Sequence, residues 1–201
     1  MIDQLQMMEV LTKLRGDAVV MPVFRANLAW KRVSSNPKRD VPIGTYDFPA
    51  AMGIGPPFAL GFCLARPETK VILLDGDGSL LMNLGALVTV AHKAPKNMFH
   101  FVMDNGVYAT TGGQDTPGAG QTSLMEMALA AGYAKAYQFD DIEEFASRAE
   151  DVLDQTGPVL VCVKTVPDVR QSRDAGAPAG TEVVLGEPQG ISNLLAEFGG
   201  G

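Results

Sequence analysis

The sequence predicts an α/β protein in which a parallel sheet is covered by helices on both faces. Apolar runs of strand length alternate with longer segments of helical period along most of the 201 residues. This alternation is the pattern that buries a parallel sheet between two layers of helices. Hydrophobic residues make up 46% of the chain. A chain of this length and composition can bury one good core, so a single domain is expected.

The first part of the chain is expected to supply a helix, a strand, a loop and a second helix. Asp3 is a suitable N-cap for a helix over residues 3–15, and an apolar strand follows at 18–23. Residues 25–40 collect basic and polar side chains and are interpreted as a solvated loop. Residues 52–65 are small and apolar and predict a helix with two prolines in its first turns.

The alternation continues to about residue 165. The expected elements are, in order, strand 71–74, helix 80–92, strand 99–103, helix 123–131, strand 133–139, helix 141–153 and strand 159–165. We therefore expect residues 1–166 to form the folded domain. Gly, Pro, Ala and Ser dominate residues 167–201, which are interpreted as a flap, a partner-docking arm or a disordered tail.

Charge and cysteine content narrow the class of protein. The 16 basic and 23 acidic side chains give a net charge of −7 without a long basic cluster, so nucleic acid is not an expected partner. Cys63 and Cys162 lie far apart in apolar surroundings, which is typical of buried reduced thiols. No apolar run reaches the roughly 18 residues of a membrane span, and the first residues do not resemble a leader. A cytoplasmic protein without a membrane anchor is expected.

The segment Gly76-Asp77-Gly78-Ser79 lies where a buried strand is followed by a helix. Glycines let the backbone approach a ligand, and the N-terminus of a helix offers free amides and a positive dipole end to an anion such as phosphate. Asp77 would repel that phosphate unless a divalent cation lies between them. The pattern therefore indicates Mg²⁺ at Asp77.

Asn105 follows the next expected strand and offers an amide oxygen of the kind that Mg²⁺ accepts. If the two strands are parallel neighbours, Asp77 and Asn105 emerge side by side at the carboxyl edge of the sheet, where open α/β sheets bind ligands. The carbonyl of Val107 is a further candidate ligand. An ordinary Asp-Gly turn that binds nothing is the alternative, and the spacing to Asn105 favours the metal site.

These residues resemble the thiamine diphosphate motif, with Gly-Asp-Gly-Ser at 76–79 and Asn-Gly-Val-Tyr at 105–108. The resemblance implies the fold of the cofactor-binding (PP) domain of thiamine diphosphate enzymes. It also implies that Asp77, Asn105 and the carbonyl of Val107 hold Mg²⁺ against the diphosphate of the cofactor.

Further roles follow from the same resemblance. Ser79 would contact the diphosphate, and Tyr108 would pack on the cofactor or fill the sheet edge. The stretch Pro-Ala-Ala-Met-Gly at 49–53 resembles the family segment that supports the bent cofactor. It implies that the Met52 side chain props the cofactor and that the Ala50 carbonyl meets its aminopyrimidine ring. A plain core methionine is the alternative for Met52.

The run Thr-Thr-Gly-Gly-Gln-Asp-Thr-Pro at 110–117 looks most like the small subunits of phosphonopyruvate and sulfopyruvate decarboxylases. This implies a thiamine diphosphate-binding subunit of a two-subunit 2-oxo acid decarboxylase that acts on a small 2-oxo acid. A related run occurs in 2-oxo acid oxidoreductases. A carboligase or oxidoreductase subunit, or a non-catalytic cofactor-binding module, therefore stays an alternative.

In this family a glutamate on a separate pyrimidine-binding domain activates the cofactor. The resemblance thus implies a partner subunit that carries that domain, and this chain alone is expected to be inactive. Arg25 and Asn27 are candidates for binding an anionic substrate or the diphosphate, whereas Phe24 would shield a hydrophobic substrate, and a solvent-facing charge is the alternative for Arg25. His100 is expected to be a core histidine rather than a catalytic base.

Overall fold

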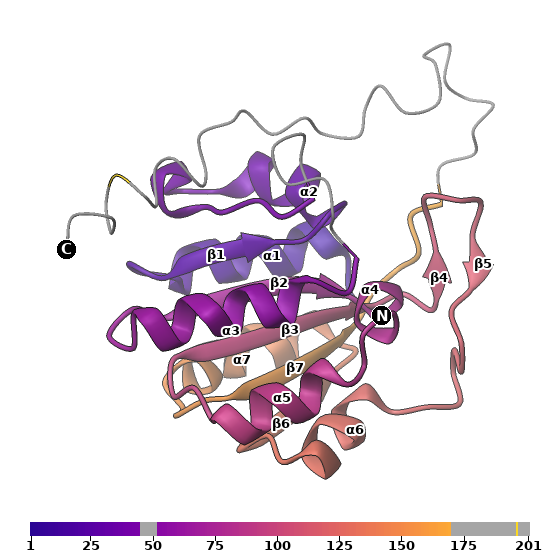
Figure 1. Cartoon of the computed structure of the whole chain (residues 1–201). Coiled ribbons are helices and arrows are strands. Elements are labelled where there is room, and N and C mark those ends of the chain that lie inside the picture. The colour runs from indigo at the N-terminus through magenta and orange to yellow at the C-terminus, as the bar shows by residue number, and fades with distance from the viewer. Residues whose placement is uncertain (45–51, 170–195, 197–201) are drawn as a thin grey trace.

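Five parallel strands form the centre of the structure, a computed structural model that describes residues 1–44, 52–169 and 196 (Figure 1). The elements are α1 (Gln4–Leu14), β1 (Val19–Pro22), α2 (Ala26–Val33), η1 (Pro37–Arg39), α3 (Gly55–Ala65), β2 (Val71–Gly76), α4 (Asp77–Leu81), α5 (Ala86–Lys93), β3 (Met98–Asp104), β4 (Val107–Tyr108), β5 (Gln114–Asp115), α6 (Leu124–Ala131), β6 (Lys135–Phe139), α7 (Ile142–Leu153) and β7 (Val159–Lys164). Ala50 and most of the predicted arm at 167–201 lie outside the described residues.

The strands of the main sheet lie in the order β1-β2-β3-β7-β6, and every neighbouring pair is parallel. One hydrophobic cluster packs α3, α5 and α6 on one face of the sheet, and a second packs α1, α2 and α7 on the other (Figure 1). The central strands are buried on both faces, which requires continuous apolar runs such as Val-Ile-Leu-Leu at the start of β2. The predicted α/β class with two helical layers is confirmed.

The starts of two helices are fixed by capping aspartates, one of which, Asp3, the sequence predicts. The Asp3 carboxylate accepts hydrogen bonds from the amides of Leu5 and Gln6, at 2.8 and 3.1 Å, at the start of α1. At the start of α7, Asp141 accepts from the amide of Glu144 at 2.9 Å. These bonds satisfy amides that have no partner inside the helix. They therefore set where α1 and α7 begin.

The interpretation of residues 25–40 as a loop is wrong, because they form helix α2 and the 3-10 helix η1. Trp30 is 1% exposed, and it lies one helical turn after the buried Ala26. Lys31 and Arg32 face solvent on the same short helix. The helix is only eight residues long and runs into the basic and polar residues of 31–40, which favoured the interpretation as a loop.

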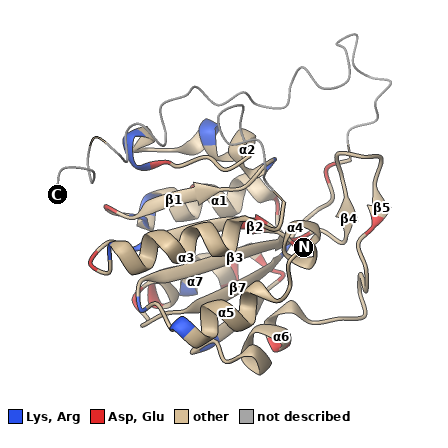
Figure 2. Cartoon of the chain, viewed as in Figure 1, with Lys and Arg blue, Asp and Glu red and all other residues tan. Residues whose placement is uncertain are grey.

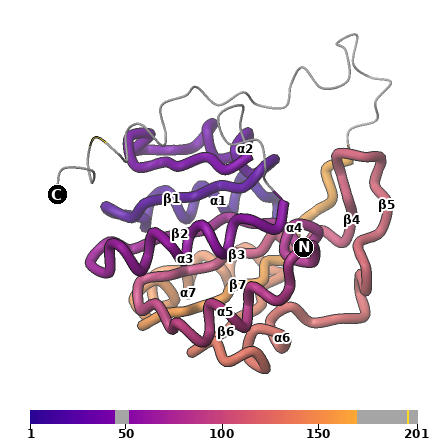
Figure 3. Tube along the Cα trace, viewed as in Figure 1, coloured from indigo at the N-terminus to yellow at the C-terminus, as the bar shows by residue number. Residues whose placement is uncertain are grey.

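The predicted helix at 80–92 is also wrong in detail, because it is divided into α4 and α5. The turn between them is fixed by Asn83, whose side-chain amide donates to the Gly53 carbonyl at 2.9 Å. Gly53 is distant in sequence, so no local pattern announces this break. The antiparallel β4–β5 pair is a further element that the sequence did not predict, and it projects from the carboxyl edge of the sheet (Figure 3).

Charged side chains occur at separate places along the described ribbon, among them the ends of α2 and α5 for Lys and Arg (Figure 2). Across the described ranges, none of the helices has both the length and the apolar character that a membrane span needs.

Both cysteines are free and buried, as predicted: Cys63 on α3 is 1% exposed and Cys162 on β7 is 0% exposed. Burial raises the pKa of each thiol to about 12. Because the thiolate is the reactive form, we expect neither thiol to react in the native protein at pH 8. Titration with a chromogenic aromatic disulfide should detect no thiol before denaturation and both after it. Rapid reaction of either thiol in the native state would contradict the observed burial.

Candidate functional site

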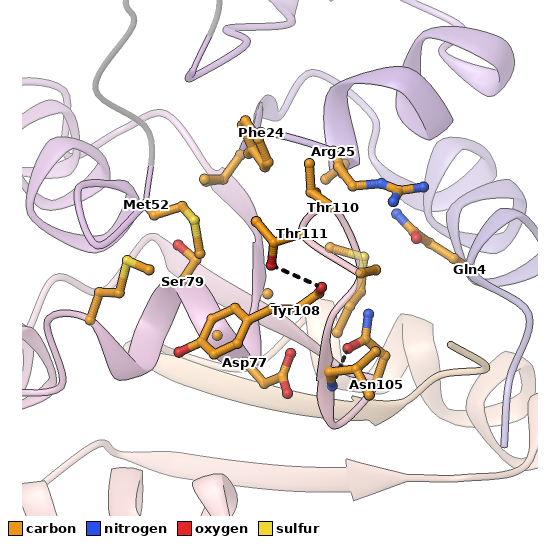
Figure 4. A pocket seen from close by; sticks show the side chains of 18 residues that line it. Gln4, Phe24, Arg25, Met52, Asp77, Ser79, Asn105, Tyr108, Thr110 and Thr111 are labelled. Carbon is orange, nitrogen blue, oxygen red and sulfur yellow. Dashed lines mark hydrogen bonds between the residues drawn. The ribbon is translucent and has the colours of Figure 1, made fainter. Parts of the chain in front are cut away.

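A cavity of about 400 Å³ opens at the carboxyl edge of β1, β2 and β3 (Figure 4). Every described residue that the family resemblance assigns to the cofactor or its metal lines it. These residues are Met52, Gly76, Asp77, Gly78, Ser79, Asn105, Val107 and Tyr108. The parallel register of β2 and β3, in which Gly76 pairs with Met103, brings the segments after the two strands together. The predicted convergence of Asp77 and Asn105 at this edge is therefore observed.

Asp77 is the first residue of α4, and its side chain is held in one orientation by two hydrogen bonds. It is 4% exposed, and its Oδ2 atom accepts from Thr116 Oγ1 at 2.9 Å and from the amide of Gly106 at 3.1 Å. Thr116 is itself buried. Sequence reasoning assigned no role to Thr116, although the residue lies inside the Thr-Thr-Gly-Gly-Gln-Asp-Thr-Pro run that carried part of the family resemblance.

The electrostatic surroundings of Asp77 favour a bound cation. Burial raises the pKa of its carboxyl, hydrogen bonds from Thr116, Gly78 and Gly106 oppose that rise, and the negative charge of Asp104 adds to it. Such a carboxylate gains from a neighbouring positive charge. The described ranges contain no group of three or more His, Cys, Asp or Glu side chains that could hold a metal. Asn105 and Val107 line the cavity with Asp77, and their amide and carbonyl oxygens are donor types that suit a hard cation rather than zinc.

Asn105 begins a tight turn that carries two of the predicted metal ligands, its own side-chain oxygen and the Val107 carbonyl. Its Oδ1 atom accepts from the amide of Val107 at 2.9 Å. Gly106 between them has φ 73°, a left-handed conformation that side chains disfavour. This conformation lets the Gly106 amide point at Asp77 while Asn105 and Val107 line the cavity. Asn105 and Gly106 therefore depend on each other for their placement.

Ser79 and Met52 are linked on the other wall of the cavity (Figure 4). The Ser79 hydroxyl accepts a hydrogen bond from the amide of Gly53 at 3.2 Å, and Asn83 binds the Gly53 carbonyl. These two bonds anchor the segment that carries Met52, which is half-buried against the cavity. Met52 is therefore a wall residue of the cavity, in the position that a supporting role requires.

Of the three candidate residues that follow β1, two line the cavity and one does not. Phe24 and Arg25 both line the cavity. Asn27 does not, because it is 4% exposed and its side-chain amide donates to the backbone carbonyl of Ile43 at 2.9 Å. The prediction that Asn27 binds an anionic ligand is therefore wrong, since its donor is used to hold the chain of residues that follows α2.

His100 lies in the core, as predicted, and is 0% exposed. Its Nδ1 atom is 3.4 Å from the Tyr133 hydroxyl and its Nε2 atom is 3.6 Å from Asp75 Oδ2. Asp75 is equally buried, and its Oδ1 atom accepts from the amide of Gly76 at 2.9 Å. Asp75 thus fixes the turn that leads to Asp77, and it does so from within the core.

Gly78 is the position where the cavity tolerates no side chain. A Cβ atom there would lie 2.5 Å from Tyr108 Cε1 and 3.2 Å from Thr116 Cγ2. We expect Gly78→Ala to displace the Tyr108 ring and to lower the free energy of unfolding by about 1–3 kcal/mol. Urea denaturation measures this change.

Gly61→Ala is the matched control, because a Cβ at Gly61 on α3 meets nothing within 4 Å. Relieving the conformational entropy of a helical glycine should stabilise the protein by up to about 1 kcal/mol. Equal effects of the two substitutions would show that contact with Tyr108 is not what requires a glycine at position 78.

The chain is similar to known thiamine pyrophosphate enzymes. The family model described as "Thiamine pyrophosphate enzyme, C-terminal TPP binding domain" matches residues 29–163. The sulfopyruvate decarboxylase subunit beta of Methanothermobacter thermautotrophicus is 34% identical over 83% of this chain and 84% of that protein. The corresponding subunit of Methanocaldococcus jannaschii is 37% identical, and the match spans 58% of this chain and 61% of that subunit.

Longer relatives match only in part. The phosphonopyruvate decarboxylase of Streptomyces viridochromogenes is 40% identical over 55% of this chain, which corresponds to 28% of that enzyme. Among solved structures, the thiamine diphosphate-dependent 4-hydroxybenzoylformate decarboxylase of Rhodococcus jostii superposes with a TM-score of 0.69, over 84% of this chain and 33% of that one, at 24% identity. This likeness supports the fold of the described domain.

Proposed function

Because this chain belongs to the thiamine pyrophosphate enzyme family through its C-terminal TPP binding domain, we propose that it is the cofactor-binding subunit of a two-subunit 2-oxo acid decarboxylase. The proposal includes Mg²⁺ as the ion between the protein and the diphosphate of the cofactor. Relatives named as beta subunits of sulfopyruvate decarboxylase support the subunit architecture.

One observation carries this proposal: the buried Asp77 carboxylate and the Asn105 amide meet at the edge of a cavity of about 400 Å³. In our proposal Asp77, Asn105 and the carbonyl of Val107 hold Mg²⁺. Their oxygen atoms are the ligand types that this ion prefers. Gly76, Gly78 and Ser79 lie at the start of α4, where free backbone amides favour a diphosphate.

The remaining wall residues suit a bound organic cofactor. Met52 lines the cavity beside Ser79, and Tyr108 covers Gly78. We propose that Met52 supports the cofactor and that Tyr108 packs against it. The proposal also assigns the carbonyl of Ala50 to the aminopyrimidine ring, on the family resemblance alone.

When bound, thiamine diphosphate would supply a nucleophilic thiazolium carbon and a cationic ring that takes up the electron pair released with CO₂. This chain would contribute the metal site, the orientation of the cofactor and a cavity that limits water. Among the described residues that line the cavity, Asp77 is the only carboxylate, and none is a glutamate. We therefore propose that the catalytic glutamate comes from a partner subunit that carries the pyrimidine-binding domain.

Product analysis of the reconstituted complex tests this function. The chain is co-expressed with a candidate partner that carries a pyrimidine-binding domain, purified with thiamine diphosphate and Mg²⁺, and supplied with sulfopyruvate, phosphonopyruvate or benzoylformate. We expect CO₂ and the matching aldehyde from the complex and neither from the chain alone. A ligated hydroxyketone, or acyl-CoA with a reduced acceptor, would replace the decarboxylase proposal with a carboligase or an oxidoreductase.

A further inference from the structure

Arg25 is the only Lys, Arg or His among the described residues that line the cofactor cavity. It follows β1 and immediately precedes α2. A second cavity of about 320 Å³ lies beside the first and is lined by Arg25, Gln4, Leu28, Arg32 and Asp168, among others. Arg25 and Gln4 line both cavities. Arg25 therefore lies between the cofactor cavity and this second cavity.

The backbone before Arg25 adopts a conformation that side chains seldom take. Phe24 has φ 49°, in the left-handed region that is unfavourable for an aromatic residue. The strained residue is held by a hydrogen bond of 2.8 Å from its amide to the Ile43 carbonyl. This local geometry places Phe24 and Arg25, which are consecutive, along the same cavity. Strain of this kind persists where the surrounding structure maintains it, and it is concentrated at functional sites.

Arg25 has a counter-ion that a ligand is able to replace. Its guanidinium contacts the carboxylate of Asp168 at 3.0 Å, and the two side chains are 27% and 72% exposed. Exposed ion pairs are weak because water and salt screen them. The side chains of Arg25 and Gln4 point toward one another at the rim of the cavity, away from Asp77 (Figure 4). An anion that enters from this side meets Arg25 before it reaches the proposed metal site.

We propose that Arg25 binds the distal anionic group of the 2-oxo acid substrate in place of Asp168, and that it selects substrates with a second negative charge. This inference rests on the proposed function. The diphosphate of the cofactor and the carboxylate of the 2-oxo acid are the other anions expected in the cavity, and the carboxylate is common to all these substrates, so it cannot account for selectivity between them. In the proposed function the charge of the diphosphate is met by Mg²⁺ at Asp77, on the wall formed after β2 and β3. Arg25 follows β1, so its guanidinium is available to bind the distal anionic group of the substrate.

Substrate selectivity of the complex tests this role. Sulfopyruvate carries a distal sulfonate, and 2-oxobutanoate carries a methyl group at the same carbon. We expect Arg25→Gln to lower kcat/KM for sulfopyruvate by about 10- to 100-fold, the loss typical of a charge-assisted hydrogen bond. The value for 2-oxobutanoate and the affinity for thiamine diphosphate should change by less than about threefold. Arg25→Lys should recover part of the selectivity, because it keeps the charge without the fork geometry.

Arg32→Gln is the matched control, since Arg32 lines only the second cavity and is exposed. Its selectivity should equal that of the wild type. Asp168→Asn should strengthen sulfopyruvate binding by about two- to fivefold, because it removes the competing carboxylate. Equal losses on both substrates would assign Arg25 to the carboxylate that they share, and weakened cofactor binding in Arg25→Gln would assign it to the diphosphate. Either result would overturn the proposal.

A binding measurement separates this inference from the proposed function. The complex is loaded with Mg²⁺ and the unreactive analogue thiamine thiazolone diphosphate, and sulfopyruvate is titrated in a calorimeter. We expect binding to the wild type and a loss of about 10- to 100-fold in Arg25→Gln. If the complex decarboxylates no 2-oxo acid, the proposed function fails, and this titration still decides the role of Arg25. Unchanged sulfopyruvate binding in Arg25→Gln would contradict that role.

Discussion

Asp77→Asn is expected to abolish Mg²⁺-dependent binding of thiamine diphosphate, with a loss of about 100-fold or more in apparent affinity. Outer-shell partners of metal ligands already contribute about 10–100-fold, and a charged ligand should contribute more. Asparagine keeps the size of the side chain and an oxygen that accepts from Thr116 and Gly106. The substitution therefore removes the negative charge and leaves the contacts with Thr116 and Gly106 in place. Calorimetry of the complex at fixed thiamine diphosphate, with and without Mg²⁺, measures the effect.

The same variant should leave the cofactor-free fold intact. Burial raises the pKa of Asp77, so ionisation of this carboxyl costs more free energy in the folded protein than in the unfolded chain. A neutral amide removes that penalty, which predicts a Tm equal to or higher than that of the wild type. Asp151→Asn is the matched control, because Asp151 is an exposed carboxylate on α7. Normal Mg²⁺-dependent binding by Asp77→Asn would show that the metal site lies elsewhere.

Trp30→Ala is expected to produce the largest loss of stability, about 3–5 kcal/mol in the free energy of unfolding. Trp30 is 1% exposed and joins α2 to the cluster that α1 and α7 form on one face of the sheet. The Arg15 guanidinium lies 5.4 Å from the centre of its ring, and Arg15 also binds Asp40 at 2.6 Å. Removing the indole leaves a cavity and withdraws the surface on which Arg15 rests.

Far-ultraviolet circular dichroism in urea measures this change, since Trp30 is the only tryptophan and fluorescence is lost with it. Lys31→Ala on the exposed side of α2 is the control and should stay within about 0.5 kcal/mol of the wild type. Trp30→Phe should be milder than Trp30→Ala, because Nε1 makes no hydrogen bond among the described residues. A loss below about 1 kcal/mol in Trp30→Ala would mean that α2 is not anchored by this side chain.

Much of the fold follows from local signals in the sequence. Asp3 and Asp141 are caps whose function needs only their own helix, and the apolar run of β2 needs only burial on both faces. Helix α2 was missed because it is only eight residues long and the basic and polar residues that follow Trp30 favoured a loop. The break between α4 and α5 depends on a contact between Asn83 and Gly53, which no local pattern contains.

The positions of Asp77 and Asn105 in the site were predicted from the sequence, and the contact of Thr116 with Asp77 was not. Asp77 and Asn105 follow directly after strands, so their convergence required only that β2 and β3 be parallel neighbours. Thr116 was missed because it reaches Asp77 only after the β4–β5 hairpin folds back. That return uses Gly112 and Gly113, with φ of 117° and 81°. The sequence contains these glycines, and their three-dimensional consequence appears only in the folded chain.

Anomalous diffraction from crystals of the complex grown with thiamine diphosphate and Mn²⁺ in place of Mg²⁺ tests the central claim most directly. We predict one strong anomalous peak within bonding distance of Asp77 Oδ, Asn105 Oδ1 and the carbonyl oxygen of Val107, with the diphosphate on its other side. A peak away from Asp77, or a cofactor bound without metal at this edge of the sheet, would contradict the account.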